Sequence, residues 1–350
     1  MSQKNPSRAL RVLIVLIAVT VILYYGRAFL LPLAFGGFLA MVFYPLILKL
    51  RKRGIPNWGG ISVAVLILTL ILGLIGGTTF FQTRSLVQDW PKIRSEIKKK
   101  QEQTEDYLIK NVGIVSEDRI EKVQKRLGEQ SQQIQSIVTS FFGSFFSSIT
   151  GTLLAFVYMV IFLWEEARLF RFVCKLATGS SEGEVHEVVN ASRTVAAQYL
   201  IGRVILIGIL SVFYSIGFMI FGLKYGIPIA ILAAVLSIIP YIGNIIGGAF
   251  AITIALATGG SASTMLGVLG TMVVAQILES NILTPWIMGD RVALNPLATV
   301  AGVIGFGIIW GVPGTILAIP VIGVTKTVFN FIPSLEPYGY LLGFNSGNDN

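Results

Sequence analysis

The strongest constraint on this chain is the near absence of charge over a long internal stretch. From Val204 to Gly289, 86 residues contain only two charged side chains, Lys224 and Glu279. Soluble domains carry about 25% charged residues, whereas this whole chain carries 13% and is 54% hydrophobic. Too few polar residues are present to cover the surface of soluble domains of this length. Because hydrocarbon requires internally satisfied backbone groups, the sequence predicts an all-α polytopic membrane protein.

The remaining charges mark loops and one polar insert. The segment from Arg84 to Glu129 holds 20 of the charged residues, 11 basic and 9 acidic. Other basic residues stand near the start of the chain and at 49–53, at the ends of apolar runs. This placement is typical of membrane topology signals and not of a nucleic-acid interface. We therefore expect the runs at 12–25 and 29–48 to form a hairpin with a cytoplasmic N-terminus, and 82–138 to lie outside.

Apolar runs of about 20 residues, the length of a transmembrane helix, divide the chain. We expect spans one to three in 1–83 and a polar helical arm in 84–140. Residues 141–203 are expected to hold span four and a cytoplasmic loop, with an amphipathic helix at 188–200. A transport core in 204–333 and a tail in 334–350 follow. The prediction is about six full transmembrane helices plus two broken or re-entrant helical hairpins. The arm packs on itself or contacts another subunit, and the sequence leaves both options open.

The predicted core contains an internal repeat, with copies at 221–258 and 296–330. The segment Phe221–Ala233 aligns with Phe306–Ala318, and seven of the 13 aligned residues are identical. Each copy later reaches an Ile-Pro-x-Ile-Gly sequence. Two copies that flank one ordinary span are typical of the inverted repeats of secondary transporters. In such transporters the binding site lies between the copies, near the bilayer midplane.

Proline and glycine interrupt both copies. In the first copy, the apolar runs 227–239 and 245–257 flank the break. Each run has about 13 residues and a length of about 20 Å, which is too short for a hydrocarbon core of roughly 30 Å. The second copy is interrupted at Gly311–Gly314. These breaks predict half-length helices around a polar cavity, although kinks that only shape close-packed spans remain an alternative.

Glu279 is the only acidic residue between Glu187 and Asp290. A carboxylate within a membrane span is energetically costly and by default marks a functional site. The alternative is a carboxylate near the inner headgroups that pairs with Arg291 or caps the next helix. We carry both interpretations forward to the structure.

The sequence around Glu279 also resembles the AI-2E family. The resemblance rests on Gln276–Pro285 with Met288-Gly289, Leu294-Asn295-Pro296, Phe306-Gly307, Pro313-Gly314 and Ile319-Pro320 downstream. It covers almost the whole chain. The resemblance implies a bacterial inner-membrane transporter, in a family named for export of the signal autoinducer-2, and a homo-oligomer. Some members of the family resemble sodium (or lithium)/proton antiporters instead.

We therefore expect a transporter of a small polar solute, with a cation/proton antiporter and a membrane scaffold without transport activity as alternatives. An enzyme is not expected, because the single histidine, His186, lies in a charged loop where no Ser-His pair or histidine-rich metal site can form in the membrane. No metal and no cofactor is expected, and the partners are the lipid bilayer and a small polar solute or a monovalent cation. Cys174, the one cysteine, cannot form an internal disulfide.

The predicted pathway combines polar side chains with helix-breaking residues. Glu279 is expected to supply charge, Tyr241 and Asn244 hydrogen bonds, and the prolines and glycines freed backbone carbonyls. The full set is Pro240, Tyr241, Gly243, Asn244, Gln276, Glu279, Asn281, Pro285, Pro313 and Pro320.

Overall fold

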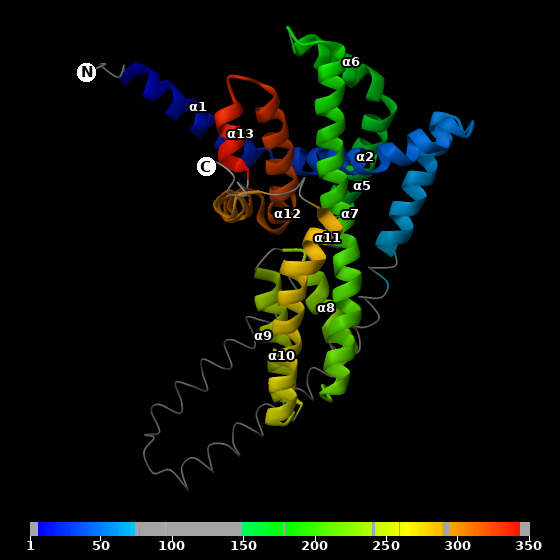
Figure 1. Ribbon diagram of the computed structural model, residues 1–350, viewed down its shortest axis with the longest axis vertical. Helices are drawn as coiled ribbons and strands as arrows, with labels where there is room; N and C mark the ends of the chain where they lie inside the picture. The colour runs from blue at the N-terminus through cyan, green and yellow to red at the C-terminus, as the bar shows by residue number, and fades with distance from the viewer. Residues whose placement is uncertain are drawn as a thin grey trace, which may run out of the picture. The chain divides into compact units, whose positions relative to one another are not determined.

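The computed structural model describes residues 6–73, 149–177, 179–239, 242–258, 260–289 and 294–343, together with Gly77 and Ser95. Within these residues every regular element is a helix (Figure 1), and the β pairing is limited to an isolated bridge between Leu294 and Gly343. The all-α class is confirmed. The predicted arm at 84–140 lies outside the described residues, apart from Ser95.

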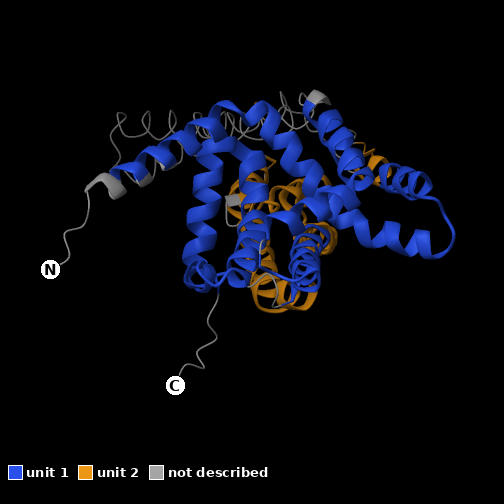
Figure 2. Ribbon diagram, turned by 90° about the horizontal axis from the view of Figure 1, so that it is seen from above, with its two compact units in different colours: residues 1–67, 148–201, 288–350 blue, residues 68–147, 202–287 orange. Residues whose placement is uncertain are grey.

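The chain divides into two compact units (Figure 2). Unit 1 comprises residues 1–67, 148–201 and 288–350, and unit 2 comprises residues 68–147 and 202–287. The first repeat copy therefore belongs to unit 2 and the second to unit 1, whereas the sequence prediction placed both in one core at 204–333. That the two copies meet around one midplane site stays a prediction.

Both units are built from apolar helices. Unit 1 contains α1 (Pro6–Tyr25), α2 (Arg27–Lys52), most of a helix over Asn57–Gly73, α5 (Ile149–Trp164), α6 (Glu166–Leu176), the first half of α7 (Glu182–Ile220), α12 (Pro296–Phe331) and α13 (Glu336–Leu342). Unit 2 contains the second half of α7, α8 (Gly226–Leu236), α9 (Ile242–Ala257), α10 (Ala262–Leu278), the π-helical segment η1 (Glu279–Leu283) and α11 (Thr284–Met288). Four helical segments, 27–52, 182–220, 262–288 and 296–331, are long and apolar enough to cross a membrane. The number of about six full crossings stays a prediction.

The first two apolar runs do not form the predicted hairpin. Only Gly26 separates α1 from α2, and its backbone (φ −79°, ψ 2°) bends the chain without reversing it. Figure 1 shows α2 leading away from α1 and not back along it. The bend interrupts the helical hydrogen-bond ladder, and the carbonyl of Leu23 accepts the indole N–H of Trp310 at 2.9 Å instead. One linking residue in this conformation does not reverse the chain, so the hairpin prediction was wrong.

The expected cytoplasmic loop with a separate amphipathic helix at 188–200 is also corrected by the structure. The loop region contains α6, and α7 is one helix of 39 residues from Glu182 to Ile220. The backbone N–H of Glu184 donates to the Ser181 hydroxyl at 3.2 Å, and the N–H of Ser181 donates to the Glu184 carboxylate at 2.7 Å. This reciprocal pair is a capping box, which starts the helix.

The first repeat copy is broken at the predicted place. Helix α8 ends at Leu236, and α9 begins at Ile242 after a reversal of direction. A Cβ atom on Gly243 would lie 1.8 Å from the carbonyl oxygen of Leu236, so only glycine permits this close approach. Helices of 11 and 16 residues span about 16 and 24 Å, less than the hydrocarbon thickness of about 30 Å. The interruption of this copy is confirmed.

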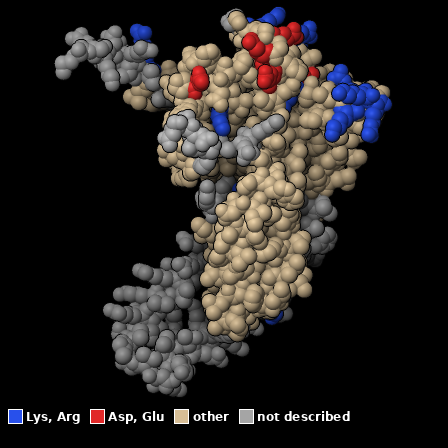
Figure 3. Space-filling view, in the orientation of Figure 1, with Lys and Arg blue, Asp and Glu red and all other residues tan. Residues whose placement is uncertain are grey.

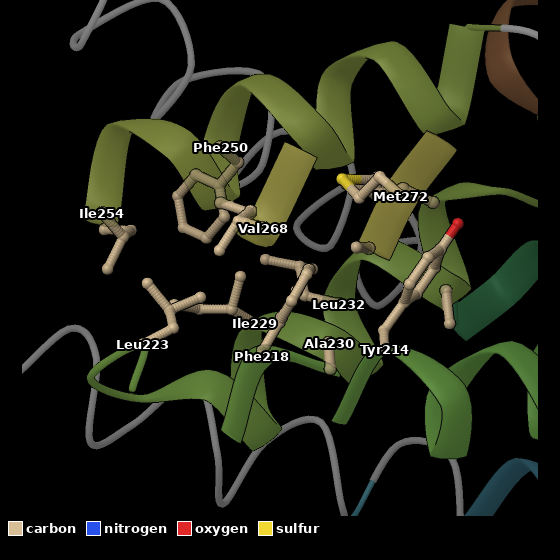
Figure 4. Packing of buried hydrophobic residues seen from close by; sticks show 14 of the residues in the cluster. Tyr214, Phe218, Leu223, Ile229, Ala230, Leu232, Phe250, Ile254, Val268 and Met272 are labelled. Atoms are coloured by element: carbon tan, nitrogen blue, oxygen red, sulfur yellow. The ribbon is translucent and has the colours of Figure 1, made fainter. Parts of the chain in front are cut away.

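Unit 2 has an aliphatic and aromatic core between α7, α8, α9 and α10 (Figure 4). Phe218, Ile229, Ala251, Ile254 and Val268 are all fully buried in it. Between helices in a bilayer such side chains stabilise the fold through van der Waals packing, because lipid tails are as apolar as they are. The core therefore fixes the short hairpin against the longer helices.

The second copy reverses at Gly311, inside α12. Gly311 has a φ of 65° and a ψ of −150°, which is a conformation that glycine adopts readily. A Cβ atom on Gly302 would lie 2.1 Å from Cδ1 of Ile322, so the segments before and after Gly311 pack against each other as a helical hairpin. The interruption predicted at Gly311–Gly314 is confirmed. Pro320, by contrast, is fully buried within a continuous helix, and the second Ile-Pro-x-Ile-Gly sequence causes no break.

Candidate functional site

A buried arginine on α7 is the first component of the site. Arg203 lies on the helix face that also carries Leu206, Leu210, Tyr214 and Phe218, at intervals of three or four residues. These four neighbours are 0–1% exposed, and Arg203 is 9% exposed. An unpaired charge at such a position costs several kcal/mol. A partner for the guanidinium is therefore required.

Glu279 is that partner. Arg203 Nη1 donates to Glu279 Oε1 at 2.9 Å, and the two side chains are only 11% and 8% exposed. The pair is neutral overall, which limits the cost of placing both charges in apolar surroundings. The alternative in which Glu279 pairs with Arg291 is not supported, because the observed cation is Arg203 and Arg291 lies outside the described residues.

Asn244 links the broken hairpin to the ion pair. Its Nδ2 donates to Glu279 Oε2 at 3.2 Å and to Gln276 Oε1. Gln276 Nε2 in turn donates to the Ser280 hydroxyl at 3.0 Å. We call Arg203, Asn244, Gln276, Glu279 and Ser280 the polar cluster. It joins α7, the start of α9, the end of α10 and η1 within unit 2.

Two buried polar atoms near these elements lack a hydrogen-bond partner. In the described part of the chain, Asn244 Oδ1 and the Tyr214 hydroxyl have none. Figure 4 shows the Tyr214 hydroxyl pointing out of the apolar core of unit 2. Buried polar groups are normally satisfied, so an unsatisfied acceptor on a residue of the polar cluster is a place where a polar molecule can bind.

The carboxylate stands on irregular backbone. Glu279–Leu283 forms a π-helical turn, in which the backbone N–H of Thr284 donates to the carbonyl of Glu279 five residues earlier. Pro285 follows directly, and its ring clashes with the carbonyl four residues before it in a regular α-helix. A wider turn relieves that clash. Single π-turns inside α-helices occur frequently at functional sites.

The structure brings together three of the ten predicted pathway residues, Asn244, Gln276 and Glu279, with Gly243 adjacent. Asn281 is exposed and donates to the carbonyl of Ile277 on its own helix, so it does not join the polar cluster. Pro285 is also exposed. The other four divide between Pro240 and Tyr241, outside the described residues, and Pro313 and Pro320, which belong to unit 1.

Sequence reasoning missed Arg203. The signal was present, because Arg203 is a single cation in the apolar run 199–210, but it was assigned to the end of a cytoplasmic loop. His186 was expected on the surface, and this is confirmed: it is exposed, with Nδ1 2.9 Å from Asn190 Nδ2. Within the described ranges, no group of three or more His, Cys, Asp or Glu residues could hold a metal ion.

Comparison with known proteins assigns the chain to a family. The sequence profile of the AI-2E family transporters matches residues 13–334. This chain belongs to the AI-2E transporter family. With several helices apolar enough to cross a bilayer, this AI-2E protein is a multi-pass membrane protein of a transport family.

Several AI-2E relatives are similar over most of their length. "Putative transport protein YueF" of Bacillus subtilis is 26% identical over 313 residues, which cover 85% of this chain and 82% of the relative. "Putative transport protein MT0215" of Mycobacterium tuberculosis is 24% identical over 349 residues and covers 96% and 92%. "Putative permease PerM" of Escherichia coli is 24% identical over 193 residues, about half of each chain. The names of these relatives describe transport proteins.

Proposed function

We propose that the chain is a permease that carries a small polar solute, similar in kind to autoinducer-2, across the bacterial inner membrane. The observation that carries the proposal is the polar cluster, whose Arg203–Glu279 ion pair is buried between the apolar helices of unit 2. Buried ion pairs add little net stability, because well-packed hydrophobic residues in their place are often neutral or stabilising. A role for Arg203 and Glu279 in handling a polar solute accounts for their presence better than stability does.

The broken hairpin of α8 and α9 carries hydrogen bonds that a solute can replace. Asn244 holds the start of α9 to Glu279 and Gln276 by side-chain hydrogen bonds. A solute with hydroxyl or carbonyl groups can replace these bonds one by one, so the cost of releasing the hairpin stays small. The unsatisfied Oδ1 of Asn244 is an acceptor already available to a hydroxyl donor.

The ion pair also bears on the sodium (or lithium)/proton antiport alternative. A monovalent cation that binds Glu279 Oε1 has to displace the Arg203 guanidinium, which donates to that oxygen at 2.9 Å, and the positive charge of Arg203 opposes a cation at Oε2 as well. We therefore place solute passage ahead of antiport, and the ion is tested alongside the solute. A scaffold without transport activity would show neither flux.

The test is flux through the purified protein in liposomes, with a panel of small hydroxylated solutes and with sodium and proton gradients applied separately. Glu279→Gln is expected to lower solute flux at least tenfold, because the neutral side chain leaves Arg203 without its counter-charge. Glu187→Gln is the matched control, since Glu187 is an exposed glutamate on α7, the helix that carries Arg203. Undiminished flux in Glu279→Gln, or no flux of any solute through the wild-type protein, would overturn the proposal.

We also propose the cytoplasmic side for the N-terminus, with α6 on that side, and a homo-oligomeric assembly. The basic residues Lys4, Arg8 and Arg11 near the N-terminus support this side under the positive-inside rule, and the basic residues of α6 support the same side for that helix. Cys174 in α6 provides the test, because it is the one cysteine of the chain. An impermeant thiol reagent should label it in inverted membrane vesicles and leave it unlabelled in intact spheroplasts. The reverse pattern would contradict the orientation.

A further inference from the structure

Helix α6 has an apolar stripe that no described part of unit 1 covers. Leu169, Phe172, Val173 and Leu176 follow at intervals of three and four residues and therefore share one face. Phe172 is 58% exposed and Leu176 is 65% exposed. A different side of the helix packs on α7, where the ring of Phe170 meets the ring of His186 edge to face.

A basic stripe runs beside the apolar one. Arg168, Arg171 and Lys175 are spaced by three and four residues, and all three are exposed. The Arg168–Glu165 contact, at 3.6 Å with side chains 81% and 40% exposed, neutralises little of this charge. Figure 3 shows acidic side chains (red) as well as basic ones (blue) over α6 and the beginning of α7, whereas the surface over α10 carries no charged side chain.

The position of α6 along the chain identifies its partner. Trp164, the last residue of α5, is 61% exposed, and exposed tryptophans at the ends of apolar helices are typical of the boundary between hydrocarbon and water. Glu165 (φ −90°, ψ 13°) then interrupts the helix, so α6 leaves the axis of α5 directly after that boundary. A helix at this level with adjacent apolar and basic stripes has the composition of an interfacial helix.

We propose that α6 binds the surface of the bilayer and that its basic stripe takes anionic phospholipid headgroups. The apolar stripe enters the region of the upper acyl chains, and the long stems of Arg168, Arg171 and Lys175 bring their charges to the phosphates. The third side of the helix remains on α7, through Phe170 and through the Glu166–Arg193 ion pair at 2.9 Å. The proposal concerns lipid and does not depend on the transported solute.

Cys174 allows a test in the full-length protein. It is half-buried within α6 and is the single cysteine, so a bimane fluorophore can be attached without any substitution. The labelled protein is placed in nanodiscs of phosphatidylcholine alone or with phosphatidylglycerol. We expect bluer emission and stronger quenching by nitroxide-bearing lipids when phosphatidylglycerol is present, and a weaker effect at high salt.

Three variants separate the effect of charge on α6 from that of charge elsewhere and from that of apolar contact. Arg168→Gln/Arg171→Gln/Lys175→Gln should lose the phosphatidylglycerol dependence, with membrane partitioning of α6 reduced on the order of a hundredfold, from about fivefold per basic side chain. Arg51→Gln/Lys52→Gln/Arg53→Gln removes the same charge from α2 and should keep the dependence. Phe172→Asp should reduce lipid quenching in both discs.

All positions substituted on α6 are exposed, so each variant is expected to elute as the wild type does on size exclusion. Equal quenching with and without phosphatidylglycerol would overturn the role of anionic lipid. If a water-soluble agent quenched the bimane on Cys174 and nitroxide-bearing lipids did not, membrane binding of α6 itself would be overturned. Protection of the label that depends on protein concentration, and not on lipid, would assign the apolar stripe to a second copy and also overturn the proposal.

Discussion

Replacing Glu279 by glutamine isolates the value of one buried charge. The amide keeps the size of the side chain and an acceptor for Asn244 Nδ2, so the packing of η1 is preserved. The Arg203 guanidinium, 11% exposed and bonded at 2.9 Å in the wild type, then has no counter-charge on Glu279. Removal of one partner from a buried pair costs about 3–5 kcal/mol. We expect the free energy of unfolding to fall by that amount.

The double variant Arg203→Met/Glu279→Gln provides the internal check. Without a charge on either side, the penalty for the stranded cation disappears, and the double variant should be more stable than the sum of the two single effects by about 2 kcal/mol. Reversible unfolding of purified protein in mixed micelles of a mild detergent and sodium dodecyl sulfate measures these differences. The exposed control Glu187→Gln should stay within about 0.5 kcal/mol of the wild type.

The reasoning fails under either of two results. The first is a Glu279→Gln protein that unfolds within about 0.5 kcal/mol of the wild type. The second is strict additivity in the double variant, because contacting charges that share one bond must be energetically coupled. Both results would mean that Arg203 and Glu279 are solvated and not paired.

Three further variants test the breaks and the cap, each by the same unfolding measurement. Gly243→Ala should destabilise the protein by more than 2 kcal/mol, since its Cβ would lie 1.8 Å from the backbone carbonyl oxygen of Leu236. Its control is Gly270→Ala, where nothing lies within 4 Å, and this change should be neutral or stabilise the protein by up to about 1 kcal/mol. Gly311→Ala should cost about 1–3 kcal/mol because of the positive φ, and Gly305→Ala, in open space on the same helix, should not. Ser181→Ala should cost about 0.5–2 kcal/mol through loss of the capping box; an unchanged stability in any of the three would reject its stated cause.

The breaks were predictable because their causes are local. Proline and glycine act on the backbone within a few residues, so the reversals near Leu236 and at Gly311 follow from short sequence windows. Even so, Pro320 shows the limit of this reasoning. It stands in the same Ile-Pro-x-Ile-Gly sequence as the break of the first copy but lies inside a helix, because packing against neighbouring helices can accommodate an internal proline.

The features that were missed depend on partners far apart in the sequence, or on a single helix that was predicted as two segments. Arg203 and Glu279 are 76 residues apart, and no local pattern states that a lone arginine will be buried. The charged beginning and apolar end of α7 suggested separate segments, although neither proline nor glycine clusters occur between Glu182 and Ile220 to divide them. At Gly26 the opposite error arose, because the two apolar runs were predicted to form a hairpin and the chain only bends between them.

The bond between the Trp310 indole and the Leu23 carbonyl has a practical consequence for anyone who shortens the protein. Leu23 and Trp310 lie near opposite ends of the sequence. The bend after α1 nevertheless leaves the carbonyl of Leu23 free to accept from Trp310, which immediately precedes the reversal of α12. An expression clone trimmed at its start to remove α1 would take away that acceptor. The damage would then appear almost three hundred residues downstream, in the last hairpin.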